Sequence, residues 1–304
     1  VRFFRRIFSI SRCLPGMSDG PFRSPVAAFS APLPLQDALA NLMSRLDLFV
    51  LAAFLPAGSV GIYAATSEVA WVMKDIRQSF DPIFAPIASS LLHEGRKERL
   101  STLFASVTRW ILILELAFLM GAALWGRMAL SVFGPSFSVG FRCLILLSVG
   151  FAVNGAFGLS EILLLMAGRS GLHLLNTVVL VAVNLVLNLA LVPRYGIEGA
   201  ALSSAVSLAL INVVRAGQAR IILGVHPFRR SLLKPLAAAG FSFAVGLSLL
   251  RLGSPWSVLS LLSLPLYFGL LRALGLEDAD YEMLEKLHAR APFLRRWASA
   301  WDRL

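Results

Sequence analysis

Long apolar segments recur along most of this chain, and each is about long enough to cross a lipid bilayer. A membrane-spanning helix needs about 20 predominantly apolar residues. The sequence has eight candidates of this kind. We therefore expect an all-α fold, a polytopic membrane helix bundle of about eight transmembrane helices. The candidate spans are residues 34–56, 59–91, 103–125, 138–167, 171–192, 196–223, 232–250 and 255–274.

The composition supports a membrane protein and argues against several other classes. Charged residues make up only 15% of the chain and hydrophobic residues 57%, whereas soluble domains are about 25% charged. The net charge of +11 is spread between apolar runs. Basic residues placed in this way set the orientation of membrane spans and contact lipid headgroups. They do not form the single patch expected for a nucleic-acid partner. The two cysteines and four histidines are scattered. We expect no disulfide framework, metal site or cofactor.

The basic residues predict an orientation. Of the 28 Lys and Arg residues, 21 fall on one side of the predicted spans, four on the other side and three within spans. The basic side faces the cytoplasm, so we expect both termini to be cytoplasmic. Residues 1–33 are expected to be a basic cytoplasmic segment or a truncated start, residues 34–274 the bundle, and residues 275–304 a cytoplasmic amphipathic tail.

The first two spans carry ionisable groups where lipid-facing helices carry none. A charge in the bilayer core costs about 2.5–3.5 kcal/mol per residue on insertion scales, so it survives where it faces protein or water. The two spans therefore indicate a polar pathway. Their polar residues are Asp37, Asn41, Arg45 and Asp47 in the first, and Glu68, Lys74, Asp75, Arg77 and Asp81 in the second.

Cationic side chains in these spans are candidates for binding an anionic substrate. Asn41 and Arg45 share a face of the first helix with Asp37 and Ser44. Arg45 and Lys74 have no opposite charge three or four positions away. They are expected to line a cavity, where a guanidinium suits phosphate. Arg77 either lines the same cavity or pairs with Asp81 four positions on.

Other polar residues within apolar spans leave alternatives open. Glu115, like Glu161, either relays protons or is a neutral acid hydrogen-bonded to a neighbouring helix. The stripe of Asn176, Asn184 and Asn188 is explained by interhelical hydrogen bonds or by a sugar-contacting wall. Trp71 is a candidate for stacking on sugars. For Tyr63, anchoring at the membrane–water interface is favoured over stacking on sugars.

Several segments resemble one family of membrane transporters. They are the run RLDLFVLAAFLPAGSVGIYAAT from Arg45, VFGPSFSVG from Val132, LVPRYGIEGAALSSAVS from Leu191, Pro86 with the loop after Leu91, and Glu277-Asp278. These segments resemble the polysaccharide transporter family, the O-antigen-type lipid-linked oligosaccharide flippases. That family belongs to the multidrug/oligosaccharidyl-lipid/polysaccharide exporter superfamily. The resemblance covers roughly residues 33–290 and corresponds to the carboxy-terminal lobe of a two-lobed fold.

The resemblance implies a function and a set of partners. The expected substrate is an undecaprenyl-pyrophosphate-linked oligosaccharide, flipped across the inner membrane for O-antigen, capsule or exopolysaccharide biosynthesis. Rocking of two lobes, driven by an ion gradient, would move it. Arg45, Lys74, Arg77 and Asn41 would then contact the substrate, and Asp47 and Glu115 would serve ion coupling. Expected partners are membrane lipids, an amino-terminal lobe and other polysaccharide assembly proteins.

The sequence leaves three alternatives to this function to be weighed. One is a multidrug-type small-molecule exporter of the same superfamily, and another is a non-functional truncated remnant. A membrane enzyme such as a glycan polymerase or ligase is disfavoured because the outer loops are short and hold only four basic residues and no histidine. Soluble-enzyme signatures such as G-x-S-x-G or a P-loop are missing. We therefore expect a transporter and not an enzyme.

Overall fold

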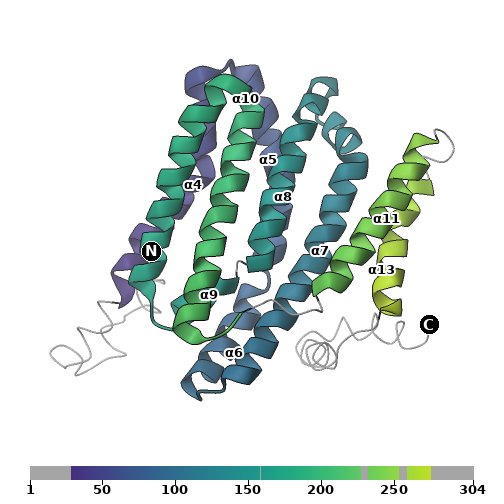
Figure 1. The fold of residues 1–304 in the computed structure, drawn as a ribbon. Coiled ribbons are helices and arrows are strands. Elements are labelled where there is room, and N and C mark those ends of the chain that lie inside the picture. Colours follow the sequence, from purple (N-terminus) through teal and green to yellow (C-terminus); the bar gives the residue numbers. More distant parts are fainter. Residues whose placement is uncertain (1–28, 158, 227–231, 253–258, 275–304) are drawn as a thin grey trace, which may run out of the picture.

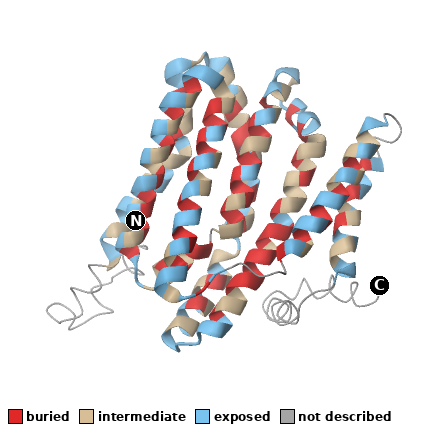
Figure 2. Ribbon diagram, viewed as in Figure 1, coloured by how far each residue is buried: buried red, intermediate tan, exposed pale blue. Residues whose placement is uncertain are grey.

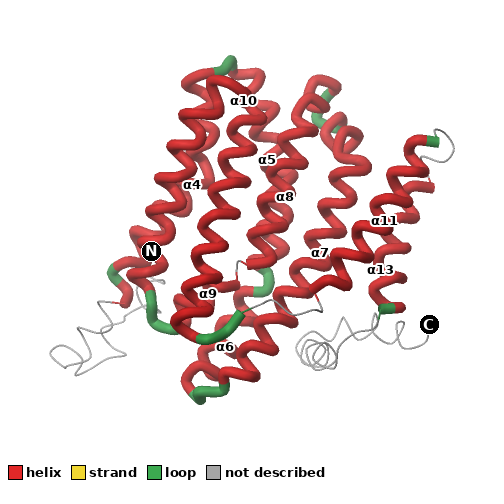
Figure 3. The backbone as a smooth tube through the Cα atoms, viewed as in Figure 1, coloured by secondary structure: helices red, strands yellow, loops and turns green. Residues whose placement is uncertain are grey.

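The computed structural model describes residues 29–157, 159–226, 232–252 and 259–274. Within these ranges every regular element is a helix, and short loops join the helices (Figure 3). The all-α fold class predicted from the sequence is confirmed. The elements are α4 (Pro32–Phe54), α5 (Ala57–Gln78), α6 (Asp81–His93), α7 (Lys97–Ser131), η1 (Pro135–Gly140), α8 (Phe141–Phe157), α9 (Leu159–Met166), α10 (Ser170–Leu223), α11 (Leu233–Arg251), η3 (Ser260–Leu262) and α13 (Ser263–Ala273).

The helices run up and down the bundle, and α4 begins on the side where α13 ends (Figure 1). In the described ranges, four segments are both long and apolar enough to cross a membrane. The ionisable helices α4 and α5 are not among them, and the count of eight spans stays a prediction. The four segments are Lys97–Ser131, Pro135–Met166, Ser170–Leu223 and Leu233–Arg251.

The longest segment, α10, is a helical hairpin. Its two arms correspond to the predicted spans 171–192 and 196–223, but the first arm continues through Pro193 and the chain reverses at Gly196. Gly196 has φ 59° and ψ −134°, a conformation open to glycine because it has no Cβ. The two arms of α10, residues 170–195 and 197–223, therefore lie side by side (Figure 1).

Two other predicted spans are interrupted. The span at 59–91 divides into α5 and α6, which begins at Asp81 with Pro82 in its first turn. Proline fits a first turn because its missing N–H is not needed there. The span at 138–167 consists of η1, α8 and α9, whereas α7 is longer than the predicted 103–125.

Apolar packing holds the bundle together in three clusters. The buried residues lie on the sides of the helices that face the interior of the bundle (Figure 2). The largest cluster joins α4, α5, α7, α8 and α10. The α11–α13 pair packs on α7, where the buried Tyr267 hydroxyl donates to the Ile113 carbonyl at 3.1 Å. The predicted basic start, apart from residues 29–33, and the predicted tail lie outside the described residues.

Candidate functional site

Asp47 lies at the centre of a buried polar cluster between three helices. Its carboxylate, on α4, accepts hydrogen bonds from the Tyr63 hydroxyl of α5 at 2.7 Å and from Asn188 Nδ2 of α10 at 2.8 Å. The Ser204 hydroxyl, on the other arm of α10, donates to it at 2.5 Å. All three donors are uncharged, so no cation balances an ionised Asp47 through these contacts.

The asparagine stripe of α10 extends this cluster. Asn184 Nδ2 donates to the hydroxyls of Ser204 at 3.1 Å and Ser207 at 3.2 Å, across the two arms that Gly196 reverses. The buried Asn188 Oδ1 has no hydrogen-bond partner in the described part of the chain. Hydrogen bonding between helices, one of the two explanations of the stripe, is confirmed. We call the six residues Asp47, Tyr63, Asn184, Asn188, Ser204 and Ser207 the Asp47 cluster.

A second feature is a cationic face built around Trp71. The Arg45 guanidinium of α4 lies 5.7 Å from the Trp71 ring centroid, and the Lys74 ammonium lies 5.6 Å from it. Cations within about 6 Å of an indole ring are attracted by its electron-rich face. Arg45 is exposed, Lys74 is half-buried, and neither forms an ion pair with any described residue. The aromatic ring thus brings together two cations from different helices.

A third feature is a buried charged cluster near the ends of α5 and α9. Arg77 Nη1 donates to Asp81 at 3.3 Å across the break between α5 and α6, which confirms that this pair forms. The Glu161 carboxylate of α9 accepts from Arg215 Nη1 at 3.0 Å and lies 3.6 Å from His173 Nδ1. Arg215 and His173 come from opposite arms of α10. Opposite charges therefore compensate one another here, as buried ions require.

The remaining predicted residues lie apart from one another. Glu115 is fully buried in α7, and Asn41 is exposed on α4, where its backbone carbonyl accepts from the Ser44 hydroxyl at 2.7 Å. Arg77 is buried at 7% exposure. The structure thus brings together Arg45 and Lys74, and it separates Arg77 from that exposed face.

Several participants were missed or misassigned from the sequence. Tyr63 is 2% exposed and bonded to Asp47, so its assignment as an interface anchor is wrong. Arg215 and Arg109, counted among the cytoplasmic-side charges, are each 3% exposed inside the bundle. Polar residues on one face of a helix recur every three or four positions. That spacing in the second arm of α10 (Ser204 with Ser207, and Asn212 with Arg215 and Gln218) is a signal that could have found these partners.

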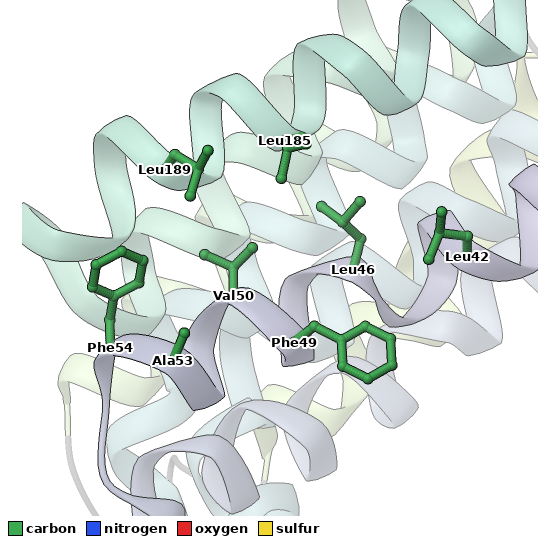
Figure 4. A pocket seen from close by; sticks show the side chains of 8 residues that line it. All are labelled: Leu42, Leu46, Phe49, Val50, Ala53, Phe54, Leu185 and Leu189. Atoms are coloured by element: carbon green, nitrogen blue, oxygen red, sulfur yellow. The ribbon is translucent and has the colours of Figure 1, made fainter.

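An apolar groove of about 320 Å³ lies between α4 and α10 (Figure 4). Its lining offers no charged or hydrogen-bonding side chain, so it does not suit a phosphate or sugar headgroup. The described residues also hold no group of three or more His, Cys, Asp or Glu side chains suited to a metal ion. The groove is lined by Leu42, Leu46, Phe49, Val50, Ala53, Phe54, Leu185 and Leu189.

Two curated archaeal proteins are similar to this chain in sequence. One is the "Probable flippase AglR" of Haloferax volcanii, 24% identical over 212 residues that make up 66% of this chain and 41% of the relative. The other is the "Probable low-salt glycan biosynthesis flippase Agl15" of the same organism, 27% identical over 178 residues, or 57% and 37% of the two chains. The chain thus spans less than half of these relatives. No family model matches it.

A solved structure shares the fold. The chain is similar to the "Lipid II flippase MurJ, inward closed conformation" with a TM-score of 0.63 and 13% sequence identity, over 79% of this chain and 52% of that one. At this identity the likeness shows a polytopic helical bundle and no more. The predicted resemblance to flippase-type transporters is confirmed by the two archaeal relatives, which are named as probable flippases. The relatives are named as flippases, which are transporters and not enzymes.

Proposed function

We propose that this chain forms one lobe of a transporter that flips a lipid-linked oligosaccharide across a membrane. Its similarity to two probable flippases supports the transport class. The observation that carries the proposal is the arrangement of α4, which presents Arg45 on an exposed face and Asp47 in a buried polar cluster. A helix that joins these two sites can couple substrate binding to ion binding.

The substrate side of the proposal rests on the cationic face. Arg45 and Lys74 would bind the pyrophosphate of an undecaprenyl-pyrophosphate-linked glycan, since guanidinium and ammonium groups donate to phosphate oxygens. Asn41 lies one helical turn before Arg45 on the same exposed side and would contact the sugar. Arg77 remains a substrate-binding candidate only if it leaves Asp81, because at 7% exposure it is withdrawn from solvent.

Asp47 is the proposed site of ion coupling. Its oxygens, the Asn188 Oδ1 and the serine hydroxyls provide oxygen ligands without a basic residue in the cluster. An ionised carboxylate in such surroundings favours uptake of a proton or a small cation. Binding that alters the bonds to Tyr63 and Ser204 would change how α4 packs against α5 and α10.

The cellular setting is proposed as a bacterial inner membrane with cytoplasmic termini, and the glycan as an O-antigen, capsule or exopolysaccharide precursor. The distribution of Lys and Arg supports this orientation. The partner of the cationic face would be the amino-terminal lobe that the family resemblance implies. The match to 41% and 37% of the two relatives leaves room for such a second lobe. The opposing walls of the two lobes would enclose the headgroup.

Complementation tests the proposal. The chain is expressed in a strain that lacks its lipid-linked oligosaccharide flippase, alone and together with the amino-terminal lobe of a homologous flippase. Surface glycan is expected to return with both parts, and Arg45→Ala with Lys74→Ala is expected to abolish the rescue at equal membrane abundance. Rescue by neither combination, with changed drug sensitivity instead, would point to a small-molecule exporter.

A further inference from the structure

The apolar groove between α4 and α10 has no occupant in the proposed function. Leu46 and Val50 of α4 are buried at its floor, whereas Phe49 of α4 and Leu185 and Leu189 of α10 are exposed along its walls (Figure 4). A continuous exposed apolar surface of this kind marks a place where another apolar molecule binds. The chemistry around the groove indicates which molecule that is.

The groove is long and narrow. Leu42 and Phe54, at the two ends of its α4 wall, are 12 positions apart, which is about 18 Å on a helix that rises about 1.5 Å per residue. Its volume of about 320 Å³ is spread along this length. Ala53 contributes only a methyl group to the lining. The shape therefore suits a hydrocarbon chain rather than a broad ring system.

The exposed side of α4 carries polar residues as well as the groove. Asp37, Asn41 and Arg45 are exposed on this helix, and α4 is not among the four described segments that are long and apolar enough to cross a membrane. Charged side chains avoid the hydrocarbon core of a bilayer. Bulk lipid therefore does not explain the groove, and an apolar strip beside these residues needs an occupant of its own.

Arg45 lies at the edge of the groove. It is three positions after Leu42 and four before Phe49, both of which line the groove, and residues with these spacings are neighbours on the surface of a helix. Arg45 also shares the Trp71 ring with Lys74. The cationic face and the groove thus adjoin along α4, one suited to an anion and the other to an apolar chain.

A polar bond on the inner side of the same two helices fixes the width of the groove. Asp47 follows Leu46 of the floor, and Asn188 precedes Leu189 of the wall. Asn188 Nδ2 donates to the Asp47 carboxylate at 2.8 Å. This bond ties α4 to α10 behind the groove, so the walls are in place before a ligand arrives. A preformed site binds its ligand with a small ordering cost.

We propose that the groove binds the isoprenoid tail of the lipid carrier while the carrier's pyrophosphate contacts the cationic face. This inference rests on the proposed function for the headgroup and adds a site for the tail. The two cations beside the groove match a head with two phosphates better than a phospholipid head with one. The isoprene units next to the pyrophosphate would lie between Leu42 and Phe54, where burial of their apolar surface favours binding.

Photolabelling of the full chain in lipid nanodiscs tests the tail site. The probe is a polyprenyl pyrophosphate with a diazirine on its second isoprene unit, and mass spectrometry maps the labelled residues. Labels are expected within residues 42–54 and 185–189, and unlabelled undecaprenyl pyrophosphate should compete for them. A phosphatidylglycerol probe with the diazirine in its acyl chain should label these residues no more than it labels the other exposed helix faces.

Ala53→Phe tests whether the groove itself holds the tail. The added ring fills the groove, so labelling there is expected to fall by roughly tenfold or more, because the tail loses contacts comparable to those of one buried side chain. Ala190→Phe is the matched control. Ala190 is exposed on α10 but does not line the groove, and this variant should label like the parent chain.

Equal labelling of the groove by the phosphatidylglycerol probe would overturn the tail site, as would undiminished labelling in Ala53→Phe. If Ala53→Phe does not fold, the comparison of the two probes on the parent chain decides. The headgroup and tail sites fail separately. Competed labelling that survives Arg45→Ala with Lys74→Ala supports the tail site and removes the headgroup from the cationic face. Binding of inorganic pyrophosphate that depends on Arg45, with an unlabelled groove, keeps the headgroup site and overturns the tail site.

Discussion

Arg45 and Asp47 lie two positions apart on α4 and face different surroundings. The Arg45 guanidinium is exposed and lies 5.7 Å from the centroid of the Trp71 ring. The Asp47 carboxylate accepts hydrogen bonds from two other helices, α5 and α10. Two positions on a helix are about 200° apart, so a small rotation of α4 moves both groups at once.

Replacing Asp47 by Asn tests the coupling site. The amide keeps the volume but removes the charge and points a donor at groups that already donate. If Asp47 couples transport to an ion gradient, the stimulation of flipping by the gradient should fall roughly 5- to 150-fold, the range of typical coupling energies. Flipping of a fluorescent lipid-linked oligosaccharide in vesicles, with and without the gradient, measures this.

The matched control for that variant is Asp37→Asn. Asp37 is exposed on the same helix, so its loss should leave gradient stimulation within about twofold because exposed charges contribute little. Equal loss in both variants would mean that net charge on α4 matters rather than the Asp47 cluster. Full stimulation in Asp47→Asn would remove Asp47 from the mechanism.

The cationic face predicts separate and joint effects of its two cations. Arg45→Ala and Lys74→Ala should each weaken substrate binding by about 10- to 150-fold, because a charge-assisted hydrogen bond contributes about 1.5–3 kcal/mol. Arg45→Lys should recover part of the loss, since it restores the charge but not the planar fork. Binding of an undecaprenyl-pyrophosphate analogue to the detergent-solubilised chain measures each step.

Arg96→Ala controls for a general loss of positive charge. Arg96 pairs with Glu94 in an exposed loop at 3.0 Å, away from Trp71, and its removal should not change binding. Wild-type affinity in both Arg45→Ala and Lys74→Ala would exclude the cationic face as the anion site. Membrane abundance is compared in every case.

The ion pair between Glu161 and Arg215 predicts an asymmetric stability pattern. Arg215→Met leaves Glu161 without its 3.0 Å partner, and breaking a buried pair on one side costs about 3–5 kcal/mol. The double variant Glu161→Gln with Arg215→Met leaves no uncompensated charge and should be more stable than the single variant. Thermal unfolding in detergent micelles ranks them. A double variant less stable than Arg215→Met would contradict the pairing.

Local sequence patterns predicted the helices better than they predicted the contacts. Apolar run length found the α7, α10 and α11 regions, because a bilayer imposes a minimum length on a helix. Helical spacing predicted the Arg77–Asp81 pair, since both residues are local to one stretch of chain. Tyr63 and Ser204 could not be assigned to Asp47 in this way. Their contacts with Asp47 depend on how three helices pack together. The spacing of residues along one helix carries no information about that packing.

The reversal of α10 marks the other limit of local patterns. Pro193 predicts a helix end because proline removes a backbone donor. However, the reversal needs a positive φ, which only Gly196 supplies. The partners of Asp47 on α10, Asn188 and Ser204, lie on opposite arms of this hairpin. The geometry of the Asp47 cluster therefore depends on a residue outside it.

Gly196→Ala tests this dependence. At φ 59° and ψ −134° a Cβ atom is strained, and such strain costs about 1–3 kcal/mol. The variant should unfold at a lower temperature and lose gradient stimulation together, because the two arms no longer align Asn188 with Ser204. Gly171→Ala, in the first turn of the same helix with nothing within 4 Å of its Cβ, should be as stable as the parent. If both variants unfold at the parent's temperature and keep gradient stimulation, the reversal does not hold the Asp47 cluster in place.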